Sequence, residues 1–219
     1  MRLVTPGVPV ISVLAGVNGA GKSSLLGRLM REVGSDYFNP DEVARRIREK
    51  TGCSANEANS LAWNEGKRNL ELAIGDRFSY SFESTLGGHT IPSLLIDAAN
   101  AGIQIVVWFV GLSSPEQHIA RVGARVAAGG HDIPEETIRQ RWDTSRRNII
   151  ALMPHLAELR VFDNSEEGNP ATGTIPEPRL LLHFRHNRIV APSARKMSAT
   201  PDWAKPIVAA ALKLQRSSR

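Results

Sequence analysis

Residues Gly16-Val17-Asn18-Gly19-Ala20-Gly21-Lys22-Ser23-Ser24 form a complete Walker A sequence, G-x-x-x-x-G-K-[ST], and this stretch decides the fold class. An apolar, β-rich run from Val8 to Ala15 precedes it, and a helical pattern of apolar residues begins at Ser23. A strand, a glycine-rich loop and a helix in this order make up the P-loop motif. The alternative is a glycine-rich turn between a strand and a helix that binds nothing. Because the strand and the helix both stand where the motif requires them, we predict that the segment binds a nucleotide.

Each part of this loop has a chemical role. The glycines let the backbone curl, so that successive N–H groups between Gly16 and Ser24 point at a phosphate chain. The helix that follows adds the positive end of its dipole. Lys22 can then reach the β- and γ-phosphates, and Ser23 can ligate Mg²⁺. We therefore expect ATP and Mg²⁺ as the cofactors.

The composition is that of one globular domain. The chain has 219 residues, of which 42% are hydrophobic and 22% charged, and both values are ordinary for a folded α/β protein. Its single cysteine, Cys53, excludes an intrachain disulfide and fits a reducing cytoplasm. No apolar run approaches the roughly 18 residues of a membrane helix. Because Pro6 and Pro9 interrupt the apolar N-terminus, we interpret it as the first strand and not as a signal peptide.

The net charge of +5 is concentrated at the C-terminus. Residues 190–219 hold six basic residues and one acidic residue, and the rest of the chain is neutral. A nucleic-acid-binding domain usually spreads its basic residues over one folded face. We therefore interpret the surplus as a solvated tail, and a nucleic-acid partner is not favoured.

Apolar periodicity predicts strands that alternate with helices. The expected strands are 8–15, 36–39, 78–83, 104–110 and 159–162, followed by a hairpin over 180–190. The expected helices are 23–33, 40–47, 55–74, 92–101, 115–128, 134–153 and 201–214. This order predicts a single domain, 1–219, with a parallel five-stranded sheet covered by helices on both faces. We expect a helical lid over about 112–153 and a basic C-terminal helix over about 201–219.

Polar residues follow three of the expected strands, where ligands of such sheets bind. Asp41, in Asn39-Pro40-Asp41, could accept a proton from a substrate hydroxyl, or it could only cap its helix. Glu83 ends the next strand at a Walker B-like position, where it could hold Mg²⁺ or substrate, and Thr85 adds a hydroxyl; a turn with a helix cap is the alternative. Asp163-Asn164-Ser165 predicts either an Asx turn or a contact with a base or ribose.

The two helices of the expected lid carry arginines that could act on a transferring phosphate. They are Arg121, Arg125, Arg139, Arg141, Arg146 and Arg147. A lid that brings arginines to the phosphates supplies charge stabilisation and excludes water. Nearby acidic residues almost balance these charges, so we expect only two or three of the six to take part. Gly129-Gly130 would supply the bend between the helices.

Together these motifs resemble the zeta toxin-like P-loop kinases, in particular a bacterial branch labelled predicted ABC-type ATPase and similar to UDP-N-acetylglucosamine kinases. The resemblance rests on motifs spread over residues 9–165: the Walker A loop, Asn39-Pro40-Asp41, Glu83-Ser84-Thr85-Leu86-Gly87-Gly88, the lid sequence and Asp163-Asn164-Ser165. It implies a nucleoside-kinase-like P-loop fold and ATP-dependent phosphotransfer. It also implies that Asp41 is the base, that Asn39, Glu83 and Thr85 contact substrate, and that the arginines of the lid contact phosphates and substrate. Arg125 with Arg139 or Arg141 would act on the phosphates, and Arg121 and Arg139 would bind substrate.

The known zeta toxins phosphorylate the sugar of UDP-N-acetylglucosamine, so the resemblance implies a small-molecule acceptor such as a nucleotide sugar, and an antitoxin protein as a partner. The toxins usually carry an arginine two residues beyond the threonine, where this chain has Gly87, and the acceptor therefore stays open. An ABC transporter ATPase is not favoured, because the Leu-Ser-Gly-Gly-Gln signature is absent. Two alternatives remain: a nucleotide-dependent switch with slow hydrolysis, and a polynucleotide kinase recruited by the basic C-terminus.

Overall fold

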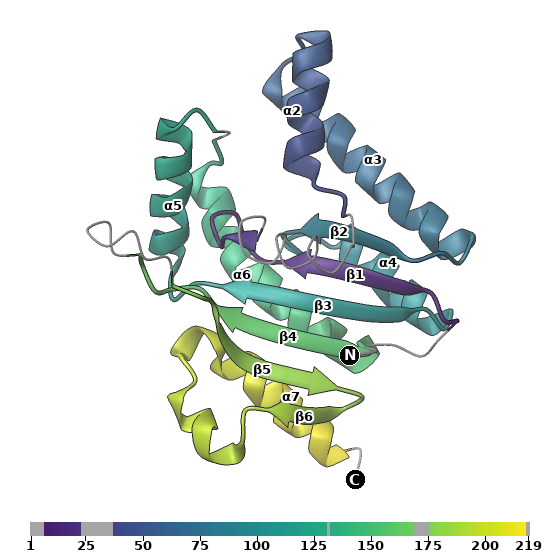
Figure 1. Cartoon of the computed structure of the whole chain (residues 1–219), viewed down its shortest axis with the longest axis vertical. Helices are drawn as coiled ribbons and strands as arrows, with labels where there is room; N and C mark the ends of the chain where they lie inside the picture. Colours follow the sequence, from purple (N-terminus) through teal and green to yellow (C-terminus); the bar gives the residue numbers. More distant parts are fainter. Residues whose placement is uncertain (1–6, 23–36, 131, 169–175, 218–219) are drawn as a thin grey trace.

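A single mixed sheet of six strands organises the fold (Figure 1). The computed structural model describes residues 7–22, 37–130, 132–168 and 176–217. The strands are β1 (Val10–Ala15), β2 (Tyr80–Ser84), β3 (Gln104–Gly111), β4 (Glu158–Asp163), β5 (Arg179–Arg185) and β6 (Arg188–Ala191). Their order is β2-β1-β3-β4-β5-β6; the first four are parallel, and β5 and β6 pair antiparallel. The carboxyl ends of the four parallel strands therefore meet at one edge.

The prediction of five parallel strands is wrong in two respects. The hairpin expected over 180–190 is confirmed, but it joins the main sheet as β5 and β6 and makes that sheet mixed. The strand expected at 36–39 is a single parallel bridge between Phe38 and Phe82 in the part of it that the structure describes. It ends at once because Asn39 caps a helix that begins with Pro40, whose ring favours the first helical position.

The helices agree with the expected ones to within a few residues at most boundaries. They are α2 (Pro40–Thr51), α3 (Ala55–Gly75), α4 (Thr90–Asn100), α5 (Pro115–Ala127), α6 (Glu135–Leu152) and α7 (Lys205–Ser217), with short 3-10 turns at Met153–His155, Ala194–Ala199 and Asp202–Ala204. Side chains of Asn39, Ser54 and Ser114 accept hydrogen bonds from the first turns of α2, α3 and α5. The helix expected at 23–33 lies outside the described residues. None of the described helices is long and apolar enough to cross a membrane.

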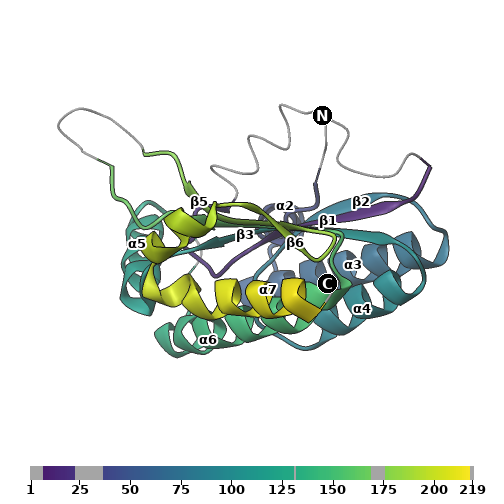
Figure 2. The same ribbon diagram turned by 90° about the horizontal axis from the view of Figure 1, so that it is seen from below.

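The main core lies between the sheet and the helices α4, α6 and α7, which lie on one face of it (Figure 2). The structure therefore confirms the expected helices on this face of the sheet. Among the described residues, no helix packs across the opposite face in the way the sequence predicts. The C-terminal segment contributes Trp203, Ile207 and Ala211, which are at most 3% exposed. The interpretation of residues 190–219 as a solvated tail is therefore wrong, because α7 packs into the core and leaves its charged residues outside.

Two helical pairs stand beside the edge at which the parallel strands end (Figure 1). The pair α2–α3 projects beyond β2 and is held together by Ala44, Ala58 and Ala62. The pair α5–α6, which corresponds to the expected lid, packs on the loop after β1 through Val17, Val122 and Ile138. The strand ends therefore lie between two projecting helical walls.

Candidate active site

The loop after β1 has a backbone that only glycine tolerates at several positions. Gly16, Gly19 and Gly21 have φ values of +143°, +81° and +87°. A Cβ on Gly16 would lie 2.3 Å from the carbonyl oxygen of Val110, and one on Gly19 would lie 2.8 Å from that of His118. The loop is thus pressed against β3 and α5. Ser23 and Ser24, expected at the phosphates and the metal, lie outside the described residues.

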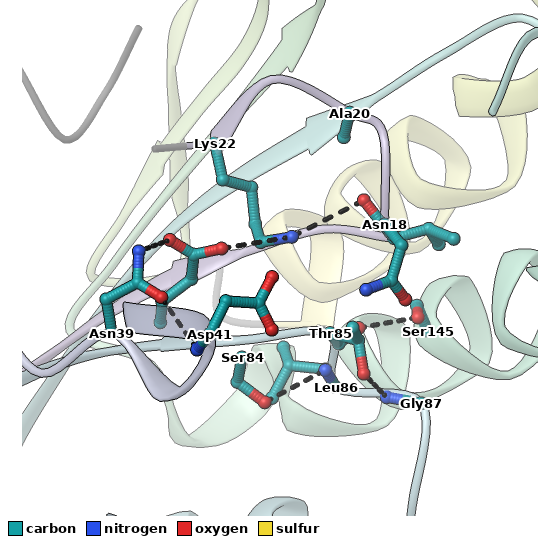
Figure 3. Close-up of polar contacts among 12 residues, drawn as sticks. Asn18, Ala20, Lys22, Asn39, Asp41, Ser84, Thr85, Leu86, Gly87 and Ser145 are labelled. Carbon is teal, nitrogen blue, oxygen red and sulfur yellow. Dashed lines mark hydrogen bonds and ion pairs between the residues drawn. The ribbon is translucent and has the colours of Figure 1, made fainter. Parts of the chain in front are cut away.

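The loop lysine is buried against an acidic residue at the end of β2. Lys22 Nζ lies 3.4 Å from Glu83 Oε1, and the two side chains are 7% and 8% exposed. Lys22 Nζ also donates to the carbonyl oxygen of Val17 at 3.4 Å, and Asn39 Nδ2 donates to Glu83 Oε2 at 3.3 Å (Figure 3). Buried charges need such partners to offset their lost hydration. The structure therefore brings together Lys22, Glu83 and Asn39, which the sequence placed on separate segments.

Asp41 reaches the same space from the first turn of α2. The cap of this helix is Asn39, whose Oδ1 accepts from the backbone N–H of Asp41 at 2.9 Å and of Glu42 at 3.3 Å. The Asp41 side chain is therefore not used as the cap, and its carboxylate points toward the space between Lys22 and Thr85 (Figure 3). Its side chain is 50% exposed, and its Oδ2 lies 3.6 Å from Arg125 Nη1.

The loop after β2 is held by one face of α6. Ser145 Oγ donates to the Thr85 carbonyl at 2.6 Å, Thr144 Oγ1 to that of Gly87 at 2.9 Å, and Asn148 Nδ2 to that of Leu86 at 2.6 Å. The Thr85 hydroxyl accepts from the Gly87 N–H at 3.3 Å. Sequence reasoning missed these three α6 residues. The signal was their spacing: Thr144 and Ser145 lie four and three residues before Asn148, and such spacings bring side chains together on a helix surface.

Arg141 lies across this loop and reaches the Walker A segment. A Cβ on Gly87 would lie 2.7 Å from Arg141 Cγ, so the absence of a side chain at Gly87 makes room for the arginine. Arg141 Nη1 donates to Asn18 Oδ1 at 2.7 Å. Burial lowers the pKa of Arg141, and the negative charge of Asp41 opposes that shift. Arg141 thus links the loops after β1 and β2 and faces Asp41.

The other arginines expected at the site lie elsewhere. Arg121 Nη2 donates to the carbonyl oxygens of Asn164 at 2.8 Å and Glu166 at 3.3 Å. Arg139 pairs with Glu116 at 2.6 Å, and this hydrogen bond lowers the pKa of Glu116. Of the expected arginines, the structure therefore brings Arg125 and Arg141 to Asp41, and it does not bring Arg121 or Arg139 there.

A cleft of about 450 Å³ opens next to Lys22 and Glu83. Its polar lining includes Asn18, Asp41, Glu83, Thr85, Gln140 and Arg141, and its apolar wall includes Phe38, Ala62, Trp63, Phe82 and Ile91. A neighbouring hollow of about 340 Å³ shares Asp41 and Asn59 with it and adds Arg45, Arg48 and Arg125. Sequence reasoning missed the contribution of α3, because a half-exposed tryptophan on a helix has no motif around it.

The Asp163-Asn164-Ser165 segment forms the predicted turn. The Ser165 N–H donates to Asp163 Oδ1 at 3.2 Å, and the Ser165 hydroxyl donates to the same oxygen. Asn164 Nδ2 donates to the carbonyl oxygen of Ala20, within the Walker A segment, at 2.8 Å. Within residues 7–22, 37–130, 132–168 and 176–217, no group of three or more His, Cys, Asp or Glu side chains could hold a metal ion.

Comparison with protein families finds that an AAA domain model (AAA_33) matches residues 11–149. An uncharacterized protein of Haemophilus influenzae is 28% identical over 127 residues, which are 58% of this chain and 88% of that protein.

Solved structures show the same fold at low identity. The complex of AvrRxo1-ORF1 with AvrRxo1-ORF2 matches with a TM-score of 0.60 in a structure with sulphate ions and 0.62 in a structure with ATP. In both, the sequence identity is 17% and the match covers 89% of this chain. This chain spans 65% and 64% of the length of the matched chains. The PezAT toxin–antitoxin system of Streptococcus pneumoniae matches with a TM-score of 0.58 and 11% identity, over 98% of this chain and 88% of that chain. At these identities the likenesses show a shared α/β fold.

Proposed function

Since the chain belongs to the AAA domain family and has a kinase-like P-loop fold, we propose that it is an ATP-dependent phosphotransferase. It would move the γ-phosphate of ATP to a hydroxyl of a small metabolite. The observation that carries this proposal is the shared cleft: the carboxylates of Asp41 and Glu83 line one space of about 450 Å³, and Glu83 pairs there with the buried loop lysine, Lys22. A cleft of this size is within the range of sites that hold small molecules.

In the proposed reaction the loop holds the phosphates. Lys22 and the backbone N–H groups would bind the triphosphate, and one of the similar AvrRxo1 complexes is a structure with ATP. Mg²⁺ prefers oxygen ligands, and Glu83 with Ser23 would hold it, Glu83 through water because both of its oxygens face protein nitrogens. When bound, the metal ion would neutralise charge on the β- and γ-phosphates.

Asp41 would act as the base. The acceptor hydroxyl gives its proton to the Asp41 carboxylate while its oxygen bonds to the γ-phosphorus, and the bond from that phosphorus to the bridging oxygen breaks to release ADP. Arg125 and Arg141 approach Asp41 from the lid and would neutralise the charge on the transferring group. Thr85 would orient the acceptor, and Asn39, which donates to Glu83, would orient the Glu83 carboxylate.

The cleft suggests an acceptor with both polar and flat apolar parts. Hydroxyl- and charge-binding residues line one side, and Trp63 and Phe38 line the other, which would suit a nucleotide sugar. The arginine that zeta toxins carry after the threonine has no room here, because Arg141 fills the space over Gly87. Arg141 would supply the positive charge instead. Since the AvrRxo1 and PezAT structures include partner proteins, an antitoxin-like partner belongs to this proposal.

The test is a screen with γ-labelled ATP and Mg²⁺ against nucleotide sugars, nucleosides, sugars and oligonucleotides, with Lys22→Ala as the blank. We expect label on one class of small acceptor and none with the variant. Labelled inorganic phosphate alone would identify the nucleotide switch, and labelled oligonucleotide ends would identify a polynucleotide kinase. Deletion of 191–219 is not a suitable test of the latter, because α7 is part of the core.

A further inference from the structure

We infer that His118 and Asn164 are positioning residues of the phosphate loop, which hold two of its carbonyl groups from outside and so aim two N–H groups at the phosphates. The inference rests on the proposed nucleotide binding and goes beyond it, because neither residue belongs to the Walker A sequence. His118 lies on α5, and Asn164 follows β4 directly.

Two short hydrogen bonds carry the inference. His118 Nδ1 lies 2.8 Å from the Asn18 carbonyl oxygen, and Asn164 Nδ2 lies 2.8 Å from the Ala20 carbonyl oxygen. A carbonyl oxygen only accepts, so each nitrogen must donate, and the His118 ring must carry its proton on Nδ1. The two side chains are 1% and 8% exposed, so bulk water is not available to replace them.

Peptide geometry converts these two bonds into a direction for the loop. In a planar trans peptide the C=O of one residue and the N–H of the next point in opposite directions. Drawing the Asn18 carbonyl toward His118 therefore turns the Gly19 N–H the other way, and drawing the Ala20 carbonyl toward Asn164 does the same for Gly21. No hydrogen bond between described residues uses either N–H. Two alternate N–H groups are thus left available for an anion.

The order of the strands shows which way these N–H groups point. In the sheet, β2 lies on one side of β1, and β3 and β4 lie on the other. His118 and Asn164 come from the β3–β4 side, whereas Glu83 and the Lys22 side chain that contacts it lie on the β2 side. The N–H groups of Gly19 and Gly21 are therefore directed away from α5 and toward the side of the loop on which the Lys22 side chain lies. Successive inward N–H groups of this kind make an anion-binding nest.

The surroundings of both residues suit a fixed support. The α5 backbone touches the loop directly, since a Cβ on Gly19 would lie 2.8 Å from the His118 carbonyl oxygen. Arg121 donates to the Asn164 carbonyl at 2.8 Å and braces the residue from α5. Burial lowers the pKa of His118 to about 4, and the positive charges of Lys22 and Arg121 act in the same direction. His118 is therefore a neutral donor at physiological pH, and its bond to Asn18 does not depend on protonation there.

The experiment compares His118→Phe, which keeps a ring without a donor, with His118→Asn, which keeps an N–H at a similar place. Titration calorimetry of the full chain with ATP and Mg²⁺ gives the dissociation constants, and thermal unfolding shows that each variant is folded. We expect His118→Phe to weaken ATP binding on the order of tenfold, the size of one lost hydrogen bond. His118→Asn should recover most of the affinity, and Asn164→Leu, which loses the donor without adding a charge, should match His118→Phe.

The outcomes separate this inference from the proposed function. If wild type binds ATP and Lys22→Ala does not, but folded His118→Phe binds as tightly as wild type, the inference is overturned alone. It is also overturned if His118→Asn is as weak as His118→Phe, since then the ring and not its donor matters. If wild type binds no ATP, or Lys22→Ala binds it equally well, the proposed function fails and the inference fails with it. Should Asn164→Leu not fold, the His118 pair still decides.

Discussion

The two sides of the cleft are built differently. On the phosphate-loop side, Lys22, Glu83, His118 and Asn164 are at most 8% exposed, and each is tied to another part of the site. On the lid side, the side chains of Arg125 and Arg139, and of Asp41, which pairs with Arg125 from α2, are 37%, 43% and 50% exposed. They make ion pairs with one another or with neighbouring acids. The first side is fixed before a ligand arrives, and the second is open to water.

This difference indicates how binding energy would be used. Breaking a buried ion pair leaves an uncompensated charge and is costly, whereas exposed ion pairs contribute little because water screens them. The pair of Lys22 and Glu83 therefore keeps its geometry, and that of Arg125 and Asp41 can exchange partners. A phosphate group that enters the cleft could draw Arg125 from Asp41 and so leave the carboxylate ready to accept a proton. Variants on each side test this contrast.

The largest expected effect is that of Asp41→Asn. The amide keeps the shape of the side chain and cannot accept the acceptor proton, so turnover should fall by about 10²- to 10⁴-fold. ATP binding should stay close to wild type, because no hydrogen bond of Asp41 shapes the Walker A loop. Transfer rates with the acceptor found in the screen and ATP calorimetry check the two halves. Near-normal turnover would remove Asp41 from the mechanism.

The same contrast explains how well the sequence predicted the fold. The Walker A loop is local, since its glycines, its strand and its lysine follow one another along the chain, and its form is therefore readable from a short stretch. The expected boundaries of most elements were close for a similar reason, because caps such as Asn39 and Ser114 lie next to the helices they begin. The strand at 36–39 was overestimated because two aromatic residues favour a strand, while the cap and Pro40 cut it short.

The support of the site was less predictable, because it depends on contacts between distant segments. His118 lies 100 residues from its partner Asn18, and Asn164 lies 144 residues from Ala20. Neither pair has a sequence pattern that joins it. The arginines of the lid show the same limit. The sequence shows how many arginines the lid carries, but which of them face Asp41 depends on how α5 and α6 pack. The basic C-terminus was misread because charge is visible in the sequence and the buried face of α7 is less so.

The next largest effect is on the pH dependence of the unfolding free energy, and it comes from His118 on the phosphate-loop side. Burial lowers the pKa of His118 from its ordinary value of 6.5 to about 4 in the folded chain. The unfolded chain therefore binds the proton first as the pH falls, and stability is full above about pH 6.5 and is lost down to about pH 4. The difference in pKa corresponds to about 3 kcal/mol of unfolding free energy. Urea unfolding at pH 7, 5.5 and 4 measures it.

His118→Asn is the control for this titration, because asparagine has no proton to gain. Between pH 7 and pH 4 wild type should lose about 3 kcal/mol more stability than the variant, while all other groups titrate alike in both. The exposed ion pairs of the lid side should add no comparable difference. Parallel curves for the two proteins would mean that His118 is not held neutral by burial, and the description of the loop side as fixed and dry would be wrong.

The smallest effect separates two arginines of the lid. Arg125 and Arg139 have similar exposure, and both form exposed ion pairs, Arg125 with Asp41 and Arg139 with Glu116 and Glu135. Replacing either by alanine should change stability little and equally, because exposed pairs contribute little. Turnover should fall about tenfold for Arg125→Ala, equal to about 1.4 kcal/mol of activation free energy, and should stay near wild type for Arg139→Ala. Equal losses of turnover would show that the lid closes far enough to bring Arg139 to the phosphates, as the sequence predicts. The lid side would then move more on ligand binding than the exchange of the Arg125–Asp41 ion pair alone requires.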